Sequence, residues 1–299
     1  MILGIDIGGT NIKFGVVDEQ FHIVHQTSIP TLAQRPGEEI VADIIAVCRE
    51  ILVKYPYDRI GIGSPGDLDM KEGIILSCSN LAFRNTPIIS MVRKALGMPA
   101  YLSKDSTCAV RAELYAGIGK SFRNLIMVTL GTGVGGGIII GGKIYEGKDG
   151  GAGEVGHIII QEDGLPCGCG QRGCLEKYAS VNALIQQTQD AIAAHPESIL
   201  ARLGAEEVTG KTAFDAKEQG CPVGTQVVES YIRHIALGLK SLIRVLQPDA
   251  VVLSGAITKQ EDNLLLPLRE MTGLDTDIYI SQLKNDAGVI GAAALTLEQ

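Results

Sequence analysis

Apolar runs interrupted by glycine occur twice along the chain. Short apolar runs on either side of a glycine turn are typical of β-hairpins. The first set is 2–5 and 12–17 around Gly8-Gly9, and the second is 125–130 and 138–140 around a turn over 131–137. We therefore predict two strand–glycine turn–strand units, and with them two related lobes.

Apolar residues recur at helical spacing in several other segments. The clearest is 225–246, where a wide apolar stripe runs to Leu246 and is stopped by Pro248. Further helices are predicted over 38–54, 87–96, 107–117, 181–195 and 213–218, and further strands over 59–63, 100–102 and 250–253. This alternation predicts an α/β protein, and we expect a ligand-binding cleft between its two lobes.

Composition narrows the possible partners. The 299 residues carry a net charge of −8, which gives no general attraction to nucleic acid or to an anionic membrane. The uncharged run 124–142 is crowded with glycine, so we do not expect it to span a membrane. No secretory signal is expected at the N-terminus, and the seven cysteines therefore indicate reduced thiols in a cytoplasmic protein.

Both glycine turns are candidate phosphate-binding loops, because glycine lets backbone N–H groups approach an anion closely. In the first turn Gly8, Gly9, Thr10, Asn11 and Lys13 are the candidates, and the preceding Asp6 is a candidate magnesium ligand. The alternative is a plain hairpin turn. In the second turn the candidates are Gly131, Thr132 and Gly133. Its spacing also contains G-x-G-x-x-G, but a strand follows it instead of a helix, which excludes the dinucleotide fingerprint.

Two further sets of residues are candidates for chemistry. His157, Cys167, Cys169 and Cys174 make a complete tetrahedral set for a structural Zn²⁺, against the alternative of three chance thiols. Asp105 follows a predicted strand and precedes a predicted helix. It can cap that helix, or it can face a ligand and accept a hydroxyl proton.

Together these motifs resemble the ROK family of bacterial sugar kinases and repressors, within the sugar kinase and actin superfamily. The resemblance covers essentially the whole chain and rests on motifs in family order: D-I-G-G-T-N, L-G-T-G-V-G-G-G, E-V-G-H and C-x-C-G-x-x-G-C-L-E. It implies a two-lobed, actin-like ATPase fold of the ribonuclease H-like type. We expect one lobe over 1–106, completed by a C-terminal helix over about 286–299, and a second lobe with the zinc loop over 107–285.

The resemblance also implies roles for single residues. Asp105 matches the catalytic base, and Glu154, His157 and Glu176 match residues that hydrogen-bond the sugar. Pro65, Gly66 and Asn80 match the rim of the sugar pocket, and Gly255 matches the loop on the nucleotide side. The implied reaction is ATP-dependent phosphorylation of the 6-hydroxyl of a neutral hexose, with Mg²⁺ accompanying ATP and with a homodimer as the assembly.

Three departures from the family pattern bear on specificity. Lys104 stands where family members acting on glucose or N-acetylmannosamine have Asn, whereas allose kinases have the basic residue Arg there. Ala82-Phe83-Arg84 lacks a usual Trp, and Leu253-Ser254-Gly255-Ala256 has fewer glycines than usual. The substrate interpretation is D-allose or glucose, with N-acetylmannosamine kinase as an alternative, and Lys104 pointing to solvent would leave sugar choice untouched.

Two other classes of protein compete with the kinase interpretation. A sugar-responsive ROK regulator would carry a DNA-binding segment of several dozen residues before the first glycine motif, for which we expect no room ahead of Asp6. An actin-like filament or ATPase without a sugar would have no need of the zinc loop beside Glu154.

Overall fold

The computed structural model describes residues 1–148 and 150–298, which form two compact units. The first unit contains Met1–Ser121 together with the chain from Gln282 onward, and the second contains Phe122–Ser281. The boundary predicted at residue 106 falls inside a helix of the first unit, because α3 (Asp105–Ala116) lies wholly within it. The predicted C-terminal helix is α10 (Ala287–Leu295), and Gln299, at the end of the predicted segment, lies outside the described residues.

The first unit is built on a five-stranded sheet with the order β3-β2-β1-β4-β8. The neighbours β1, β4 and β8 are parallel, and β1 to β3 are antiparallel. The strands are β1 (Ile2–Ile7), β2 (Asn11–Val17), β3 (Ile23–Pro30), β4 (Arg59–Ser64) and β8 (Ala100–Lys104). The first predicted hairpin is therefore present as β1 and β2.

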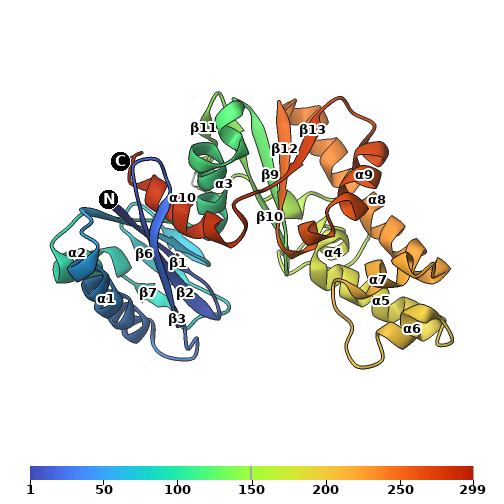
Figure 1. Cartoon of the computed structure of the whole chain (residues 1–299), viewed down its shortest axis with the longest axis horizontal. Helices are drawn as coiled ribbons and strands as arrows, with labels where there is room; N and C mark the ends of the chain where they lie inside the picture. The colour runs from blue at the N-terminus through green and yellow to red at the C-terminus, as the bar shows by residue number, and fades with distance from the viewer. Residues whose placement is uncertain (149, 299) are drawn as a thin grey trace. The chain divides into compact units, whose positions relative to one another are not determined.

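Alternation along the strands sends side chains to two different cores. Leu3, Ile5 and Phe14 point to the face covered by α1 (Gly37–Lys54) and α2 (Ile88–Leu96). Ile2 and Val17 point to the face covered by α3 and α10 (Figure 1). The helix predicted over 38–54 is thus α1, and its Ile40 and Ile44 pack on the sheet.

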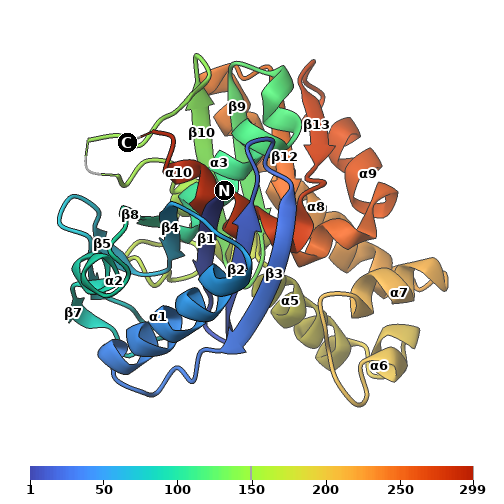
Figure 2. The same ribbon diagram turned by 60° about the vertical axis from the view of Figure 1, so that its left-hand side comes forward.

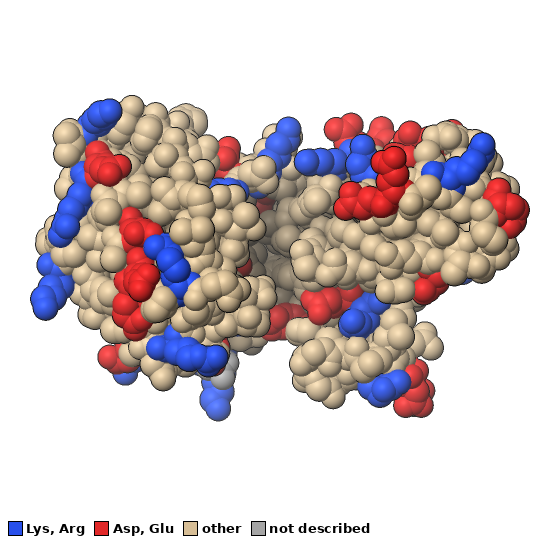
Figure 3. Space-filling model, turned by 90° about the horizontal axis from the view of Figure 1, so that it is seen from below, with Lys and Arg blue, Asp and Glu red and all other residues tan. Residues whose placement is uncertain are grey.

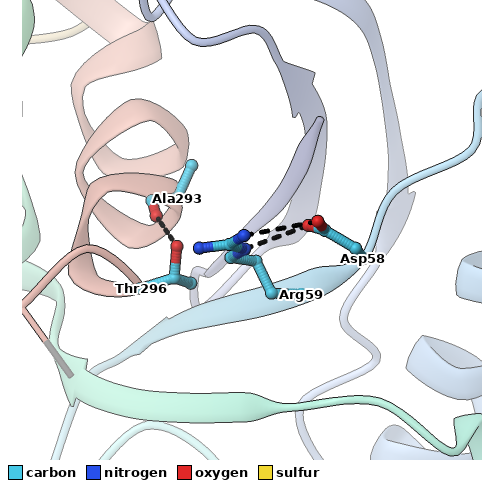
Figure 4. A network of polar contacts seen from close by, with 4 residues as sticks. All are labelled: Asp58, Arg59, Ala293 and Thr296. Atoms are coloured by element: carbon cyan, nitrogen blue, oxygen red, sulfur yellow. Dashed lines mark hydrogen bonds and ion pairs between the residues drawn. The ribbon is translucent and has the colours of Figure 1, made fainter.

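Helix α10 packs on the sheet with backbone against backbone. A Cβ atom added at Gly4 would lie 2.0 Å from the Val289 carbonyl oxygen, and one added at Gly61 would lie 1.6 Å from that of Ala292. At the far end of α10 the Thr296 hydroxyl donates to the Ala293 carbonyl oxygen at 2.9 Å, beside the start of β4 (Figure 4). The contact therefore leaves no room for a side chain at position 4 of β1 or position 61 of β4.

The first unit also contains a small antiparallel sheet that the sequence did not predict. It has the order β5-β6-β7 and consists of β5 (Asp67–Asp69), β6 (Ile74–Ser77) and β7 (Arg84–Thr86). Only Pro65 and Gly66 separate this sheet from β4, because Asp67 already pairs with Ser77. The short helix η1 (Ile118–Ser121) ends the first part of the unit, and η4 (Lys284–Asp286) precedes α10.

The second unit repeats the sheet arrangement of the first, with the order β11-β10-β9-β12-β13. It consists of β9 (Leu125–Leu130), β10 (Val134–Ile140), β11 (Lys143–Ile144), β12 (Ala250–Ser254) and β13 (Asp277–Ile280). The predicted glycine turn over 131–137 is too long. Gly135 to Gly137 belong to β10, because each pairs with a residue of β9.

Helices of the second unit gather on a core around the long helix α8 (Figure 2). Tyr231, Ile232 and Ile235 of α8 are buried there, as its helical period predicts. The other helices are α4 (Glu176–Ala179), α5 (Val181–Ala194), α6 (Ile199–Leu203), α7 (Thr212–Glu218) and α9 (Asp262–Thr272), with α8 spanning Pro222–Leu246, and two short 3₁₀ segments, η2 (Val155–His157) and η3 (Ala256–Gln260).

Charge and hydropathy add two observations. On the face shown in Figure 3, acidic and basic side chains are interspersed. Within residues 1–148 and 150–298, every helix is too short or too polar to cross a lipid bilayer.

Candidate functional site

Three candidate segments meet at one edge of the first sheet. The register pairs Asp6 of β1 with Gly63 of β4, and Ser64 of β4 with Lys104 of β8. Because these strands are parallel, their carboxyl ends share an edge, and neighbouring strands lie about 4.8 Å apart. Asp6, the Pro65-Gly66 turn and Asp105 therefore lie at the same edge, although they are up to about a hundred residues apart in the sequence.

Asp105 is the first residue of α3 and is exposed at that edge. Its Oδ1 accepts a hydrogen bond from the Ser106 backbone N–H at 2.7 Å, so the carboxylate is oriented by its own helix turn. Lys104 occupies the N-cap position of α3 and makes no side-chain cap hydrogen bond, so the Asp105 carboxylate lies in the first turn, where its charge interacts favourably with the helix dipole. This placement is equally compatible with a base held in a fixed orientation.

Asp6 is half-buried and interacts electrostatically with Asp105 and Lys13. Burial raises the pKa of Asp6 above its ordinary value of 3.8, the positive charge of Lys13 opposes that rise, and the negative charge of Asp105 adds to it. Among the described residues no hydrogen bond to the Asp6 carboxylate is found. Such an acceptor, close to a second carboxylate, fits a divalent cation held by oxygen ligands.

Hydrogen bonds fix the conformation of the first glycine turn, which joins β1 to β2. The Gly8 N–H donates to the Asn11 carbonyl at 3.0 Å, and the Thr31 N–H and hydroxyl donate to the Thr10 and Gly8 carbonyls. Gly9, Thr10 and Asn11 are exposed. The Lys13 Nζ donates to the Asn285 carbonyl at 3.2 Å.

The predicted rim of the sugar pocket lies on loops of the same unit. Asn80 is exposed after β6, and its Oδ1 lies 3.4 Å from the Ser79 hydroxyl. Gly66 follows β4 with a φ of 101°. Lys104 is half-buried at the end of β8. Lys104 and the Pro65-Gly66 turn thus lie at the sheet edge that carries Asp105, because Ser64 pairs with Lys104.

The second glycine turn and Gly255 lie together in the second unit. Gly255 follows β12 with a φ of 100°, and a Cβ atom there would lie 2.2 Å from the Leu130 carbonyl oxygen. The side chains of Thr129 and Ser254, at the ends of β9 and β12, are linked by a 2.9 Å hydrogen bond. Gly255 therefore packs against the end of β9, directly before Gly131.

The segment with Glu154 and His157 lies across β10. Its Gly156 is so close to this strand that a Cβ atom would lie 2.0 Å from the Val134 carbonyl oxygen. Val155 is buried between the two candidate side chains, while Glu154 is exposed and His157 is half-buried. Glu154 and His157 thus flank a buried pair, Val155 and Gly156, and their own side chains stay accessible.

His157, Cys167, Cys169 and Cys174 form a compact cluster, with all four ligand atoms within 4.8 Å of one another. His157 Nδ1 lies 3.6 Å from the Cys167 sulfur, and the Cys169 and Cys174 sulfurs are 3.6 Å apart. Ligands of a tetrahedral ion with metal–sulfur bonds of about 2.3 Å are separated by similar distances. The donor set and its spacing therefore fit a closed, four-coordinate metal site.

Glu176, two residues after the last of these cysteines, contacts the second glycine turn. Its Oε2 accepts the Val134 backbone N–H at 3.0 Å. It also borders a cavity of about 500 Å³ whose remaining lining comes mainly from α4, α5 and α8. Neither Glu154 nor His157 lines that cavity, so we do not assign the sugar to it.

Comparison with known proteins decides the family. The ROK family profile matches residues 2–299. The chain belongs to the ROK family. A glucokinase of Streptomyces coelicolor is 36% identical over 312 aligned residues, which cover 100% of this chain and 98% of that protein. The fold prediction of an actin-like α/β protein is thereby confirmed.

Two other ROK proteins place this chain within the family. The crystal structure of a ROK family glucokinase from Streptomyces griseus in complex with glucose and AMPPNP has a TM-score of 0.82 and 32% identity, covering 100% of this chain and 99% of that one. A xylose repressor of Caldicellulosiruptor bescii is 28% identical across 99% of this chain, but the alignment covers 78% of the repressor.

Two neighbours of the ROK site were not found from the sequence. Gly288 of α10 lies against Asp6, since a Cβ atom there would lie 2.4 Å from Asp6 Oδ2. The Val134 N–H is the partner of Glu176. Neither contact has a local signal, because the partners are far apart in the sequence and the second donor is a backbone group.

The raised pKa of Asp6 predicts that this residue costs stability. Below pH 3.8 the carboxyl is protonated in the folded and unfolded chain, so its burial costs little there. As pH rises through the higher folded pKa, a buried charge must form, and stability is lost. We expect Asp6→Asn to melt at a higher temperature than the wild type at pH 7 without metal or nucleotide, by about 2–4 °C for each kcal/mol recovered.

The measurement is Tm against pH in the presence of a chelator. The advantage of Asp6→Asn should shrink toward pH 3.8 and grow toward neutrality. An advantage that is constant across this range would contradict a cost due to ionisation.

Proposed function

We propose that the protein is an ATP-dependent hexose kinase that phosphorylates the 6-hydroxyl of a neutral hexose. The observation that carries the proposal is the pair Asp6 and Asp105, two interacting carboxyl groups at one edge of parallel strands. The Asp6 carboxylate is suited to binding a divalent cation, and the Asp105 carboxylate is suited to accepting a proton. The ROK glucokinase relatives support the same reaction class.

Phosphoryl transfer depends on positioning and on neutralising charge, with little covalent chemistry for the protein. In the proposed mechanism the backbone N–H groups of the two glycine turns bind the phosphates of ATP. Asp6 would hold Mg²⁺, which supplies positive charge to the terminal phosphates. Asp105 accepts the proton of the 6-hydroxyl as the hydroxyl oxygen attacks the γ-phosphorus.

The second unit orients the sugar in this proposal. Glu154, Glu176 and His157 hydrogen-bond the ring hydroxyls so that the 6-hydroxyl is directed toward the γ-phosphate. His157 suits two tasks, because its Nδ1 faces the cysteine cluster and its Nε2 lies on the other side of the ring. Fixed orientation of this kind lowers the barrier by pre-organising the reacting groups.

Replacing Asp105 with Asn tests the base. The variant should bind ATP normally, and its kcat should fall by about 10²–10⁴-fold, the usual cost of a lost general base. A matched control is Asp262→Asn, because Asp262 is also an exposed first residue of a helix. Coupled ADP detection with hexose measures both; an Asp105→Asn variant with more than about a third of the wild-type kcat would contradict the role.

D-Glucose and its C3 epimer D-allose are the proposed substrates, and Lys104 separates them. The relatives favour glucose. Lys104, half-buried beside Asp105, favours allose, because an ammonium group donates but cannot accept a hydrogen bond. A glucose hydroxyl left without an acceptor would cost about 1–3 kcal/mol, whereas inversion at C3 moves that hydroxyl to the other face.

The test of the sugar is kcat/KM for allose, glucose, mannose and N-acetylmannosamine. If Lys104 selects the sugar, Lys104→Asn should lower the allose-to-glucose ratio by about tenfold, corresponding to 1.4 kcal/mol. An unchanged ratio would show that Lys104 takes no part in sugar choice, and glucose would then be the substrate if it leads the panel. Turnover of ATP without dependence on any sugar would contradict the kinase proposal itself.

We further propose that the cysteine cluster holds one structural Zn²⁺ per chain. Three thiolates and one imidazole without an open position are the donor set of closed zinc sites. The site would fix the loop from His157 to Cys174 and so position His157 and Glu176. Because burial raises the pKa of Cys174 to about 12, binding must displace its proton, and the metal should be lost in acid.

Elemental analysis of protein purified without added metal should find about one zinc per chain. Cys167→Ser combined with Cys169→Ser should lose the zinc, lower Tm and weaken sugar binding together. Cys221→Ser, at a cysteine outside the cluster, should keep the metal. Full sugar affinity in the zinc-free double variant would contradict a positioning role for the metal.

A further inference from the structure

One short segment forms hydrogen bonds with both ends of the second glycine turn. At one end Glu176 Oε2 accepts the Val134 N–H at 3.0 Å. At the other end the Val181 N–H donates to the Gly131 carbonyl at 2.8 Å. Residues 176–181, which we call the clamp segment, therefore hold both flanks of the turn that is proposed to bind phosphate.

The clamp segment is itself rigidly fixed to the core. Leu175, just before it, is buried, and its side chain lies so close to Gly238 of α8 that a Cβ atom there would be 2.6 Å away. The Tyr231 hydroxyl donates to the Ala179 carbonyl at 2.9 Å, and the Ser180 hydroxyl caps α5. A side chain anchored in this way can hold a flexible glycine turn in one conformation.

The Glu176 carboxylate lies against Gly133 of the turn. The nearest atoms that an added Cβ would meet all belong to Glu176, the first of them Oε2 at 2.3 Å. The other carboxylate oxygen, Oε1, makes no hydrogen bond within the described part of the chain. One oxygen of Glu176 thus binds the turn, and the other can accept a hydroxyl.

We propose that Glu176 is a positioning residue that couples hexose binding to the conformation of the 131–134 phosphate turn. The proposal rests on the kinase function and goes beyond a contact to the sugar. A hexose hydroxyl donating to Oε1 restricts the carboxylate, and the restricted carboxylate holds the Val134 N–H and the turn in place. When the sugar has already ordered the 131–134 turn, the nucleotide no longer has to supply the free energy for that ordering. The two ligands therefore bind cooperatively.

The experiment measures the dissociation constant of Mg²⁺–AMPPNP by calorimetry, with and without saturating D-glucose, and with D-allose in parallel. For the wild type the ratio of the two constants should be at least about fivefold. By thermodynamic linkage, AMPPNP should lower the dissociation constant of the sugar by the same factor. Gly133→Ala, whose new methyl group displaces Oε2, should bring the ratio close to one.

Gly135→Ala is the matched control, because an added Cβ there meets no atom within 4 Å and the backbone is extended. It should keep the wild-type ratio. Glu176→Gln separates the two oxygens: its amide oxygen can still accept the Val134 N–H, while its amide nitrogen cannot accept a hydroxyl. This variant should bind AMPPNP alone as the wild type does, but lose sugar affinity and the cooperativity.

The outcomes distinguish this inference from the function on which it rests. A wild type that binds neither hexose nor AMPPNP contradicts both. A wild type that binds both independently, or a folded Gly133→Ala or Glu176→Gln variant with the wild-type ratio, overturns the coupling and leaves the kinase proposal intact. Circular dichroism and zinc content verify folding of each variant, and the Gln variant keeps the test decisive if the alanine variant fails to fold.

Discussion

The first unit depends on the contact between α10 and the sheet, in which backbone meets backbone. Gly4 and Gly61 have no side chains, so α10 can approach the backbone of β1 and β4 directly. Gly291 of α10 allows an equally close approach to α3, because a Cβ atom there would lie 1.6 Å from the Cys108 carbonyl oxygen. Dense packing of this kind tolerates little added volume. Because α3 begins at Asp105 and α10 begins beside Asp6, the contact sets the distance between the two carboxyl groups of the site.

The same contact explains why the end of the chain belongs to the first unit. Arg111 of α3 is fully buried, and its Nε donates to Glu298 Oε2 at 2.9 Å, which ties the last described residue to the helix that carries Asp105. A buried guanidinium needs such a partner, because leaving the charge unpaired is costly. The sheet edge that carries Asp6 and Asp105 is thus supported by a residue nearly two hundred positions later.

The second unit uses a different means to position flexible backbone. Its glycine turn has almost no side chains with which to hold itself, so the clamp segment supplies hydrogen bonds from outside. The cysteine cluster lies immediately before that segment, and Leu175 links the two through a hydrogen bond from its N–H to the Ile158 carbonyl at 2.9 Å.

The sequence by itself determined the elements whose signal is local. The long helix α8 follows from a period of 3.6, the two hairpins from apolar runs around glycine, and the cluster of His157 with three cysteines from residue type and close spacing. Tertiary structure decided what depends on distant partners. Strand β10 extends through glycines because β9 pairs with it, α9 forms although Pro267 interrupts its pattern, and the strands β5, β6 and β7 are too short to show a period. The contacts of Asp6 with Gly288 and of Glu176 with Val134 were decided in the same way, because each joins segments that become neighbours only when the sheets have formed, and one partner in each pair contributes no side chain that a sequence pattern could reveal.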